Sequence, residues 1–309
     1  MRLVKKQIIK GEEMASIRSQ LLAVFLRMTV KKQFAKSGDL IKERESMNKM
    51  SAMSVKCKHG ELDVLGGVPG EWHHAELGSK ETVILYLHGG GYVLGSPSSH
   101  RGLAALMANL AQAKVFILDY RLAPETPYPG ALDDAVSAYK ALLDNGELPE
   151  KIVIAGDSAG GGLTIALMVA LKEQGLPLPA AGVCLSPWVD LSFSGDSMQT
   201  NAKADSILCK ESLAWLGGQY LADLPDNDPQ ASPLFADLSG LPPLLIQVGS
   251  DEVLLDDAVR LNKLAKKAGV DSTLEVWDGQ VHVWQLMSKL IPEARQALQV
   301  IGTFIKTHT

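Results

Sequence analysis

Cysteine, aromatic residues and long apolar runs are all scarce in this 309-residue sequence. Cys57, Cys184 and Cys209 are odd in number and form no Cys-x-x-Cys pair, which excludes a full disulfide framework and the usual zinc motifs. No stretch approaches the ~20 consecutive apolar residues that span a bilayer. With 46% hydrophobic and 21% charged residues, the composition is that of a globular protein. We expect a cytoplasmic protein with reduced thiols, no bound metal and no cofactor.

Charge is also small overall, but its distribution is uneven. The net charge of −5 is too small to predict a nucleic-acid partner. Residues 1–50 contain twelve Lys or Arg against five Asp or Glu, a net of +7, so residues 51–309 carry −12. The apolar run from Leu21 to Val30 begins too late for a secretory signal, is broken by Arg27 and precedes no small-residue cleavage site. We therefore predict neither secretion nor stable insertion into a membrane.

The basic N-terminal segment contains an apolar stripe at helical spacing. Its members are Ile17, Leu21, Val24, Phe25 and Met28, which predict an amphipathic helix. Two interpretations stay open, a helix packed on its own domain and a lid or membrane-surface helix. We expect the stripe to cover one side of the ligand cleft.

From about residue 53 onward, short apolar runs indicate strands, and from about residue 114 these alternate with helical segments. The predicted strands are Met53–His59, Val64–Ala75, Thr82–Leu87, Lys114–Leu118, Ile152–Ala155, Ala181–Leu185, Leu244–Val248 and Thr273–Val276. The predicted helices are Tyr128–Leu143, Ala159–Gln174, Leu213–Leu221, Asp257–Ala268 and Pro292–Thr307. Such alternation predicts an α/β fold with a mostly parallel sheet, helices on both faces, and ligands at the carboxyl ends of the strands.

One segment interrupts this alternation. About fifty residues separate Leu191 from the next strand, too many for a bare loop in a compact domain. We expect residues 192–240 to form a cap insertion, residues 1–50 an N-terminal helical arm that completes the cap, and residues 51–191 with 241–309 the catalytic domain.

The stretch Ile152–Gly162 carries the clearest chemical signal. A short apolar strand runs into Gly156-Asp157-Ser158-Ala159-Gly160 and then into a helix. The pattern Gly-x-Ser-x-Gly between strand and helix is a nucleophile elbow, which exposes the serine oxygen at a helix N-terminus. A glycine-rich phosphate loop fits worse, because neither Gly-Lys-Ser/Thr nor Gly-x-Gly-x-x-Gly is present here.

A nucleophilic serine needs a base, and the base needs an acid to orient it. Asp251 follows the strand Leu244–Val248, and His282 lies just past the strand Thr273–Val276. The order Ser158, Asp251, His282 is the chain order of an α/β-hydrolase.

Other residues compete for the two supporting roles. The remaining histidines follow no late strand; they are His59, His73, His74, His88, His100 and His308. Asp256, Asp257 and Asp278 are the alternative acids, and we expect Asp256 to brace the loop after the strand. Asp251 is preferred because it stands just beyond the strand end.

A glycine run follows the strand Thr82–Leu87, in His88-Gly89-Gly90-Gly91-Tyr92. Glycines let backbone amides approach a developing oxyanion without side-chain interference. We expect Gly90, Gly91 and Ala159 to supply the oxyanion hole, and His88 to brace the loop rather than to transfer protons.

Taken together, several motifs resemble those of the bacterial hormone-sensitive-lipase family of esterases. They are His88–Tyr92, Asp119–Glu125 with Pro127 and Pro129, the elbow Gly156–Gly161, and Ser186-Pro187-Trp188. The resemblance covers roughly residues 80–290. It implies an α/β-hydrolase body of about eight strands with a small helical cap, Ser158, Asp251 and His282 as the catalytic triad, and cofactor-independent hydrolysis of carboxylic esters with short acyl chains.

The expected partner is thus a small-molecule ester, and a homodimer is left open. Amidase, formamidase or lactonase activity on the same scaffold is the rival enzymatic interpretation. A non-catalytic ligand-binding protein is the rival from another class, and the presence of His282 disfavours it, because the plant gibberellin receptors that resemble this family have lost the base.

Overall fold

The computed structural model describes residues 9–10, 15–31, 39–49, 57, 60–78 and 81–309. The strands within these residues are β1 Ile9–Lys10, β2 Glu61–Leu65, β3 Val68–His74, β4 Val83–Leu87, β5 Lys114–Leu118, β6 Ile152–Asp157, β7 Ala181–Leu185, β8 Leu244–Gly249 and β9 Ser272–Trp277. They form a single sheet in the order β1-β9-β8-β7-β6-β4-β5-β3-β2.

The sheet is mostly parallel, as predicted. Strands β4 to β9 pair in parallel, whereas β3 runs antiparallel to both of its neighbours, β2 and β5. Strands β3 to β9 correspond to seven of the eight strands expected from the sequence, whereas β2 does not coincide with the eighth, Met53–His59. The two-residue β1 adds a parallel edge beside β9. Because β4 to β9 share one direction, the loops that follow them meet at one edge of the sheet.

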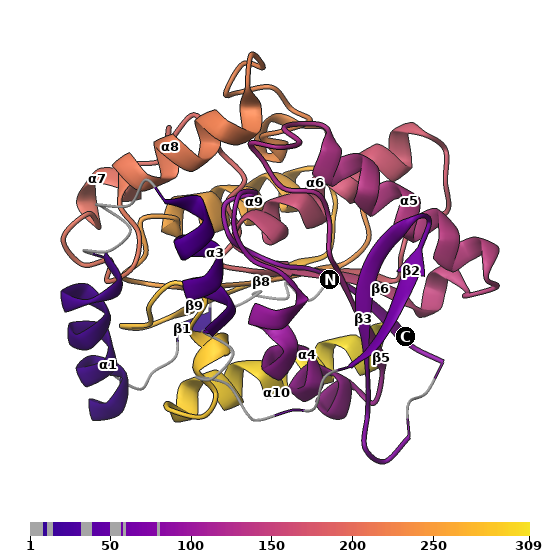
Figure 1. Cartoon of the computed structure of the whole chain (residues 1–309), viewed down its shortest axis with the longest axis horizontal. Helices are drawn as coiled ribbons and strands as arrows, with labels where there is room; N and C mark the ends of the chain where they lie inside the picture. The colour runs from indigo at the N-terminus through magenta and orange to yellow at the C-terminus, as the bar shows by residue number, and fades with distance from the viewer. Residues whose placement is uncertain (1–8, 11–14, 32–38, 50–56, 58–59, 79–80) are drawn as a thin grey trace, which may run out of the picture.

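Helices cover both faces of this sheet (Figure 1). The described helices are α1 Ile17–Met28, α3 Leu40–Asn48, α4 Pro97–Ala111, α5 Gly130–Asp144, α6 Ala159–Glu173, α7 Ser197–Thr200, α8 Lys210–Leu221, α9 Leu255–Lys267 and α10 Pro292–His308, with short 3₁₀ turns at Pro149–Lys151, Pro233–Phe235 and Trp284–Met287. None of them is long and apolar enough to cross a membrane.

Successive side chains of the strands point to opposite faces of the sheet and pack into two separate hydrophobic cores. In β4, Ile84 and Tyr86 join the core on the side of α4 and α10, whereas Leu85 and Leu87 join the core beneath α5, α6 and α9. Strands buried on both faces read as continuous apolar runs, which is why the central strands were predictable.

The first hairpin differs from the prediction. Val64–Ala75 was expected as one strand, but it contains the turn between β2 and β3. Gly66 and Gly67 have φ angles of 59° and 83°, the left-handed geometry that a two-residue hairpin turn requires. The predicted strand Met53–His59 lies outside the described residues, apart from Cys57.

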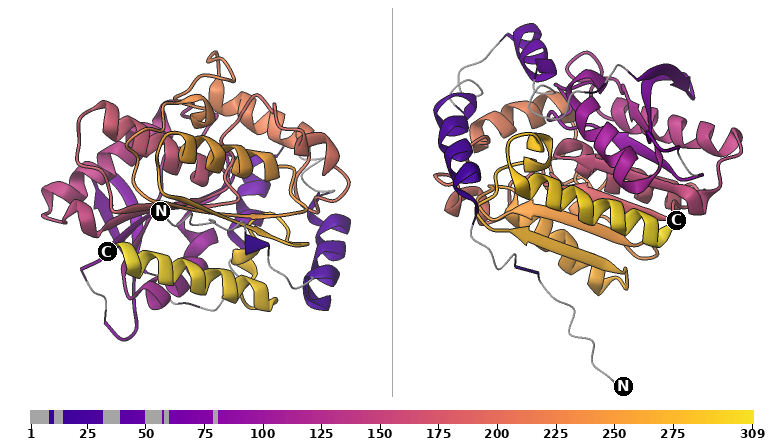
Figure 2. Two further views of the ribbon diagram at one scale, coloured as in Figure 1. Left: turned by 180° about the vertical axis from the view of Figure 1, so that it is seen from behind. Right: turned by 90° about the horizontal axis from the view of Figure 1, so that it is seen from below.

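Helices α1, α3, α7 and α8 come from the two segments predicted to form a cap, and they lie together at one end of the molecule (Figures 1 and 2). Arg27 at the end of α1 donates to the carbonyl of Ala204 at 2.7 Å, and Lys31 donates to the carbonyls of Ala202 and Asp205 at 2.8 Å. These hydrogen bonds join the N-terminal segment to residues 202–205.

The orientation of α1 is opposite to the prediction. The stripe Ile17, Leu21, Val24, Phe25 and Met28 faces solvent, with every member more than half exposed. The helix instead packs inward through Ser19, Ala23 and Leu26. Small residues allow a close approach to the body, whereas helical spacing alone does not show which face turns inward. The stripe therefore does not cover the cleft, contrary to the prediction.

Candidate active site

Ser158 stands at the sharp turn between β6 and α6. Its backbone has φ 54° and ψ −121°, a strained conformation for a non-glycine residue. The turn is fixed by the Ser158 amide, which donates to the carbonyl of Leu185 at 2.8 Å, and by the Ser158 carbonyl, which accepts from the amide of Trp188 at 2.9 Å. The predicted nucleophile elbow is thus present in the structure.

The glycines of the elbow are sterically required. A Cβ on Gly160 would lie 1.9 Å from the carbonyl oxygen of Leu87, and one on Gly156 would lie 2.3 Å from the carbonyl oxygen of Gly160. Strand β4, the elbow and the start of α6 therefore approach too closely for any side chain at these two positions.

His282 follows β9 and lies at the same edge of the sheet. Its Nδ1 donates to Oε2 of Glu252 at 2.7 Å, and both side chains are buried. Burial lowers the pKa of His282, but the hydrogen bond and the charge of Glu252 outweigh it, so the pKa lies above its ordinary value of 6.5. The other ring nitrogen remains for proton exchange with a neighbouring group.

The prediction that Asp251 orients His282 is wrong. The Asp251 carboxylate accepts from the hydroxyl of Ser250 at 3.2 Å and is only partly buried. Its neighbour Glu252 turns inward instead, because the Oε1 atom of Glu252 accepts from the Gly249 amide at 2.6 Å and from the Ser186 hydroxyl at 2.7 Å. The turn after β8 thus directs the second of two consecutive carboxylates at the histidine.

Ser186 is a site residue to which the sequence analysis gave no role. Besides donating to Glu252, its hydroxyl accepts from the amide of Val283 at 3.1 Å. It therefore ties the loop that carries the acid to the loop that carries the histidine. The signal was present in Ser186-Pro187-Trp188, which directly follows the buried strand β7.

The other candidate acids have structural partners elsewhere. Asp256 accepts from the amide of Ser197 at 2.8 Å and so joins α9 to α7. Asp257 accepts from the amides of Val189 and Asp190 at 2.9 and 3.0 Å, and burial raises its pKa to about 8. Neither contacts His282.

The glycine loop after β4 lies beside the elbow. Gly90 and Gly91 adopt φ angles of 123° and 64°, and a Cβ on Gly90 would lie 2.2 Å from the Leu94 carbonyl oxygen. Within the described part of the chain, no hydrogen bond engages the amide N–H groups of Gly90, Gly91 or Ala159. Three backbone donors near Ser158 are therefore available to an anion, which is the arrangement an oxyanion hole requires.

A buried hydrogen-bond network around Asp157 holds the glycine loop in place. Asp157 accepts from the Gly89 amide at 3.0 Å and from the Tyr86 hydroxyl at 2.7 Å, and His100 lies 3.2 Å from the same carboxylate. Burial raises the pKa of Asp157, but the interaction with His100 and the hydrogen bond from Tyr86 outweigh it, so the pKa lies below its ordinary value. The residue before the serine thus anchors the glycine loop to the elbow.

His88 has the bracing position expected of it. Its Nδ1 contacts the Gly89 carbonyl at 2.9 Å, and its ring stacks on Tyr120 with centroids 4.2 Å apart. Burial lowers its pKa to about 3, so the ring is neutral at physiological pH.

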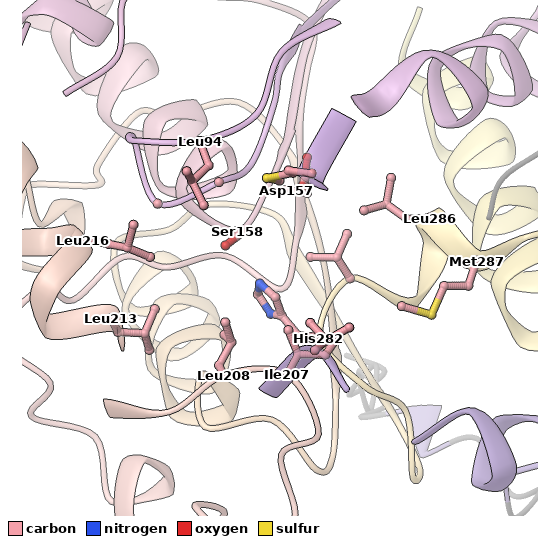
Figure 3. Close-up of a pocket in the computed structure, with 15 residues that line it drawn as sticks. Leu94, Asp157, Ser158, Ile207, Leu208, Leu213, Leu216, His282, Leu286 and Met287 are labelled. Atoms are coloured by element: carbon pink, nitrogen blue, oxygen red, sulfur yellow. The ribbon is translucent and has the colours of Figure 1, made fainter. Parts of the chain in front are cut away.

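Ser158 and His282 line one apolar pocket of about 650 Å³, including its mouth. Figure 3 shows the imidazole directed at Ser158, with Leu213 and Leu216 on one side and Leu286 and Met287 on the other. The remaining lining residues are Gly90, Gly91 and Leu94 after β4, Asp157 at the end of β6, Val283 beside the histidine, Ile207 and Leu208 before α8, and Val30 and Met47 in the N-terminal segment. No cluster of three or more metal-ligating side chains occurs among the described residues.

Comparison with known proteins agrees with this geometry. Residues 84–286 match the family model of the alpha/beta hydrolase fold. An acetyl-hydrolase of Streptomyces hygroscopicus is 46% identical over 250 residues, covering 81% of this chain and 83% of the relative. An esterase of Acinetobacter venetianus is 41% identical, covering 78% and 79% of the respective chains.

Solved structures extend the similarity over nearly the whole chain. The structure of EstE5 soaked with ethyl alcohol superposes with a TM-score of 0.91 at 41% identity, covering 95% of this chain and 99% of that one. An esterase from the bacterial hormone-sensitive lipase family superposes with a TM-score of 0.90 at 44% identity, covering 96% and 99%. With this fold, these motifs and these relatives, the chain belongs to the bacterial hormone-sensitive-lipase family of esterases within the α/β-hydrolase superfamily.

Proposed function

We propose that this protein is a serine carboxylesterase in which Ser158 is the nucleophile, His282 the base and Glu252 the acid. One observation carries the proposal. The serine at the elbow, the imidazole that is hydrogen-bonded to Glu252, and three backbone amides without a hydrogen-bond partner in the described structure lie together at one apolar pocket. The protein is accordingly a carboxylic ester hydrolase, in agreement with the names of its relatives.

Each side chain has a defined task in this reaction. The free nitrogen of His282 accepts the Ser158 proton as the serine oxygen attacks the ester carbonyl, and Glu252 keeps the other proton on Nδ1. The amides of Gly90, Gly91 and Ala159 stabilise the oxyanion. The alcohol leaves with a proton from His282, and water releases the acid from the acyl-enzyme by the same steps.

The substrate is proposed to be a small ester with a short acyl chain. Among the described residues, the lining is mostly aliphatic, and its acidic or basic side chains are those of Asp157 and His282. Such a lining favours a neutral, apolar ester over a charged one. We further propose a cytoplasmic location, with which the three free cysteines are consistent. We also propose that the chain divides into an N-terminal arm of residues 1–50, a cap insertion of residues 192–240 and a catalytic body.

Ser158→Ala tests the central assignment. We expect the variant to keep its fold and to lose more than about a thousandfold in turnover of p-nitrophenyl acetate, because the covalent intermediate cannot form. Ser137→Ala is the matched control, since Ser137 lies on α5 and does not line the pocket. Near-normal activity of Ser158→Ala, or failure of a fluorophosphonate probe to label Ser158, would contradict the proposal.

A substrate panel tests the substrate class. We expect kcat/KM to fall from p-nitrophenyl acetate and butyrate to palmitate, and p-nitroacetanilide to react far more slowly than the acetate ester. Faster cleavage of the anilide would favour the amidase alternative, and a preference for palmitate would refute the short-chain assignment.

A further inference from the structure

Helix α1 presents an apolar stripe that nothing in the described structure covers. Ile17, Leu21, Val24, Phe25 and Met28 are 75%, 66%, 52%, 59% and 63% exposed. Five large apolar side chains on three turns of one helix exceed the scattered exposure that is ordinary for a protein surface. In Figure 1 the helix lies at the margin of the molecule, so the stripe is accessible to a large partner.

The helix is fastened in this orientation. The amide of Ser16 donates to Glu293 at the start of α10 at 2.7 Å, and Arg27 donates to the Ala204 carbonyl at 2.7 Å. Contacts at both ends, together with the buried residues Ser19, Ala23 and Leu26, hold the inner face against the body. The stripe is therefore displayed to solvent by the native packing and does not serve as a lid over the pocket.

Positive charge borders the stripe on both sides. At 100° per residue, Arg18 falls beside Phe25 at one margin, and Arg27 falls at the opposite margin. No acidic residue occurs between Ile17 and Met28. The segment 1–50 has a net charge of +7, whereas the rest of the chain carries −12. An apolar helical face bordered by arginines is the pattern of a helix that lies in the interface of an anionic bilayer.

The size of the surface argues against a second copy of the chain as its occupant. A helix of 12 residues is roughly 18 Å long and 10 Å wide, a footprint of about 200 Å². A stable protein interface buries about 800 Å² of accessible surface on each partner, so a contact between two copies would have to extend well beyond α1. Two copies of α1 would also bring their arginines together, and that repulsion favours an anionic partner instead.

We propose that α1 docks the enzyme on the surface of an anionic phospholipid bilayer, with the stripe inserted among the acyl chains and Arg18 at the phosphates. Docking does not depend on the proposed ester hydrolysis, but the C-terminal end of α1 lies next to the pocket. Val30, two residues beyond α1, lines the pocket that contains Ser158. Docking would therefore bring the pocket near esters that partition into the bilayer.

Co-sedimentation with vesicles tests this proposal. The full chain is incubated with vesicles of ether-linked phosphatidylglycerol and phosphatidylcholine in equal parts, and with ether-linked phosphatidylcholine alone, since ether lipids contain no ester to hydrolyse. We expect about tenfold tighter binding to the mixed vesicles, and a loss of that preference at high salt. Arg18→Gln should weaken binding to the mixed vesicles alone.

The stripe itself is tested by the double variant Leu21→Gln/Phe25→Gln, which keeps good helix-forming residues at exposed positions. We expect at least about a tenfold loss of vesicle binding with unchanged turnover of p-nitrophenyl acetate in solution. The matched control is Leu62→Gln/Leu77→Gln, because these leucines are 80% and 94% exposed and lie on or just after the hairpin β2–β3, away from α1 (Figure 1).

Three outcomes would overturn the proposal: no binding of the wild-type chain to either vesicle, equal losses in the two double variants, or a stripe variant that changes the molecular mass measured by ultracentrifugation. The last would identify the stripe as an interface between proteins. A chain that binds vesicles but hydrolyses no ester would refute the proposed function and leave the docking intact.

Discussion

Replacing Glu252 by glutamine is expected to abolish most of the activity while leaving the turn after β8 in place. The amide oxygen of glutamine can still accept from the Gly249 amide and the Ser186 hydroxyl, which lie 2.6 and 2.7 Å from Glu252 Oε1. Its NH₂ group then replaces the carboxylate oxygen that lies 2.7 Å from His282 Nδ1. Two donors cannot face one another, so Nδ1 must become an acceptor.

The consequence is a change of tautomer. An imidazole that accepts at Nδ1 has its proton on Nε2, and it cannot take a proton from Ser158 there. Fixing the wrong tautomer in a serine triad lowers turnover by roughly 10⁴-fold, which is about 5 kcal/mol of activation free energy. We expect a loss of this size in kcat for p-nitrophenyl acetate.

Asp251→Asn is the matched control, because Asp251 is the adjacent carboxylate and accepts only from Ser250 in the described structure. Its kcat/KM should remain within about threefold of wild type. Circular dichroism establishes that both variants are folded. If Asp251→Asn lost activity by orders of magnitude while Glu252→Gln retained it within tenfold, the assignment of the acid would be refuted.

Three further predictions concern the pKa of His282, the close packing at Gly160 and the buried carboxyl of Asp257. The kcat/KM of the wild type should rise with pH through a midpoint above 6.5, because Glu252 raises the pKa of His282 and only the neutral ring accepts the serine proton; a flat profile from pH 5 to 9 would contradict this. Gly160→Ala should unfold at a clearly lower temperature or fail to fold, because its Cβ would lie 1.9 Å from the Leu87 carbonyl oxygen. In the control Gly218→Ala, on α8, the added Cβ meets nothing within 4 Å, so the change should be neutral or stabilising by about 0.5–1 kcal/mol. Equal melting temperatures of the two variants would remove the steric explanation. The pKa of Asp257 is about 8 in the folded state and near 3.8 in the unfolded chain, so its burial destabilises the fold increasingly from about pH 4 to pH 8. Asp257→Asn should therefore flatten the fall in melting temperature between pH 5 and 9. An unchanged slope would refute the assignment.

Most of the fold could be read from the sequence because the central strands are buried on both faces. Lys114–Leu118 and Ala181–Leu185 match β5 and β7 in the structure, since apolar runs between loops leave few alternatives. The hairpin was less predictable, because an apolar pattern continues across Gly66 and Gly67 and only their left-handed backbone makes the turn.

The site was predictable where the chemistry fixes the sequence locally. The elbow around Ser158 and the glycine loop are dictated by close backbone approach, which leaves a readable pattern. The acid was not, because Asp251 and Glu252 are adjacent carboxylates and their directions depend on the hydrogen bonds of the turn. Likewise, the spacing of Ile17 to Met28 defines a helix face without showing whether that face turns toward the protein or toward its surroundings.

Mass spectrometry of the enzyme, quenched with acid during turnover of p-nitrophenyl acetate, is the most direct test of Ser158 as the nucleophile. We predict one acetyl group on the peptide that contains Ser158 in the wild-type enzyme, and none on the corresponding peptide of Ser158→Ala. An unmodified Ser158 throughout turnover, or an acetyl group on another residue of the pocket with full activity, would contradict this prediction.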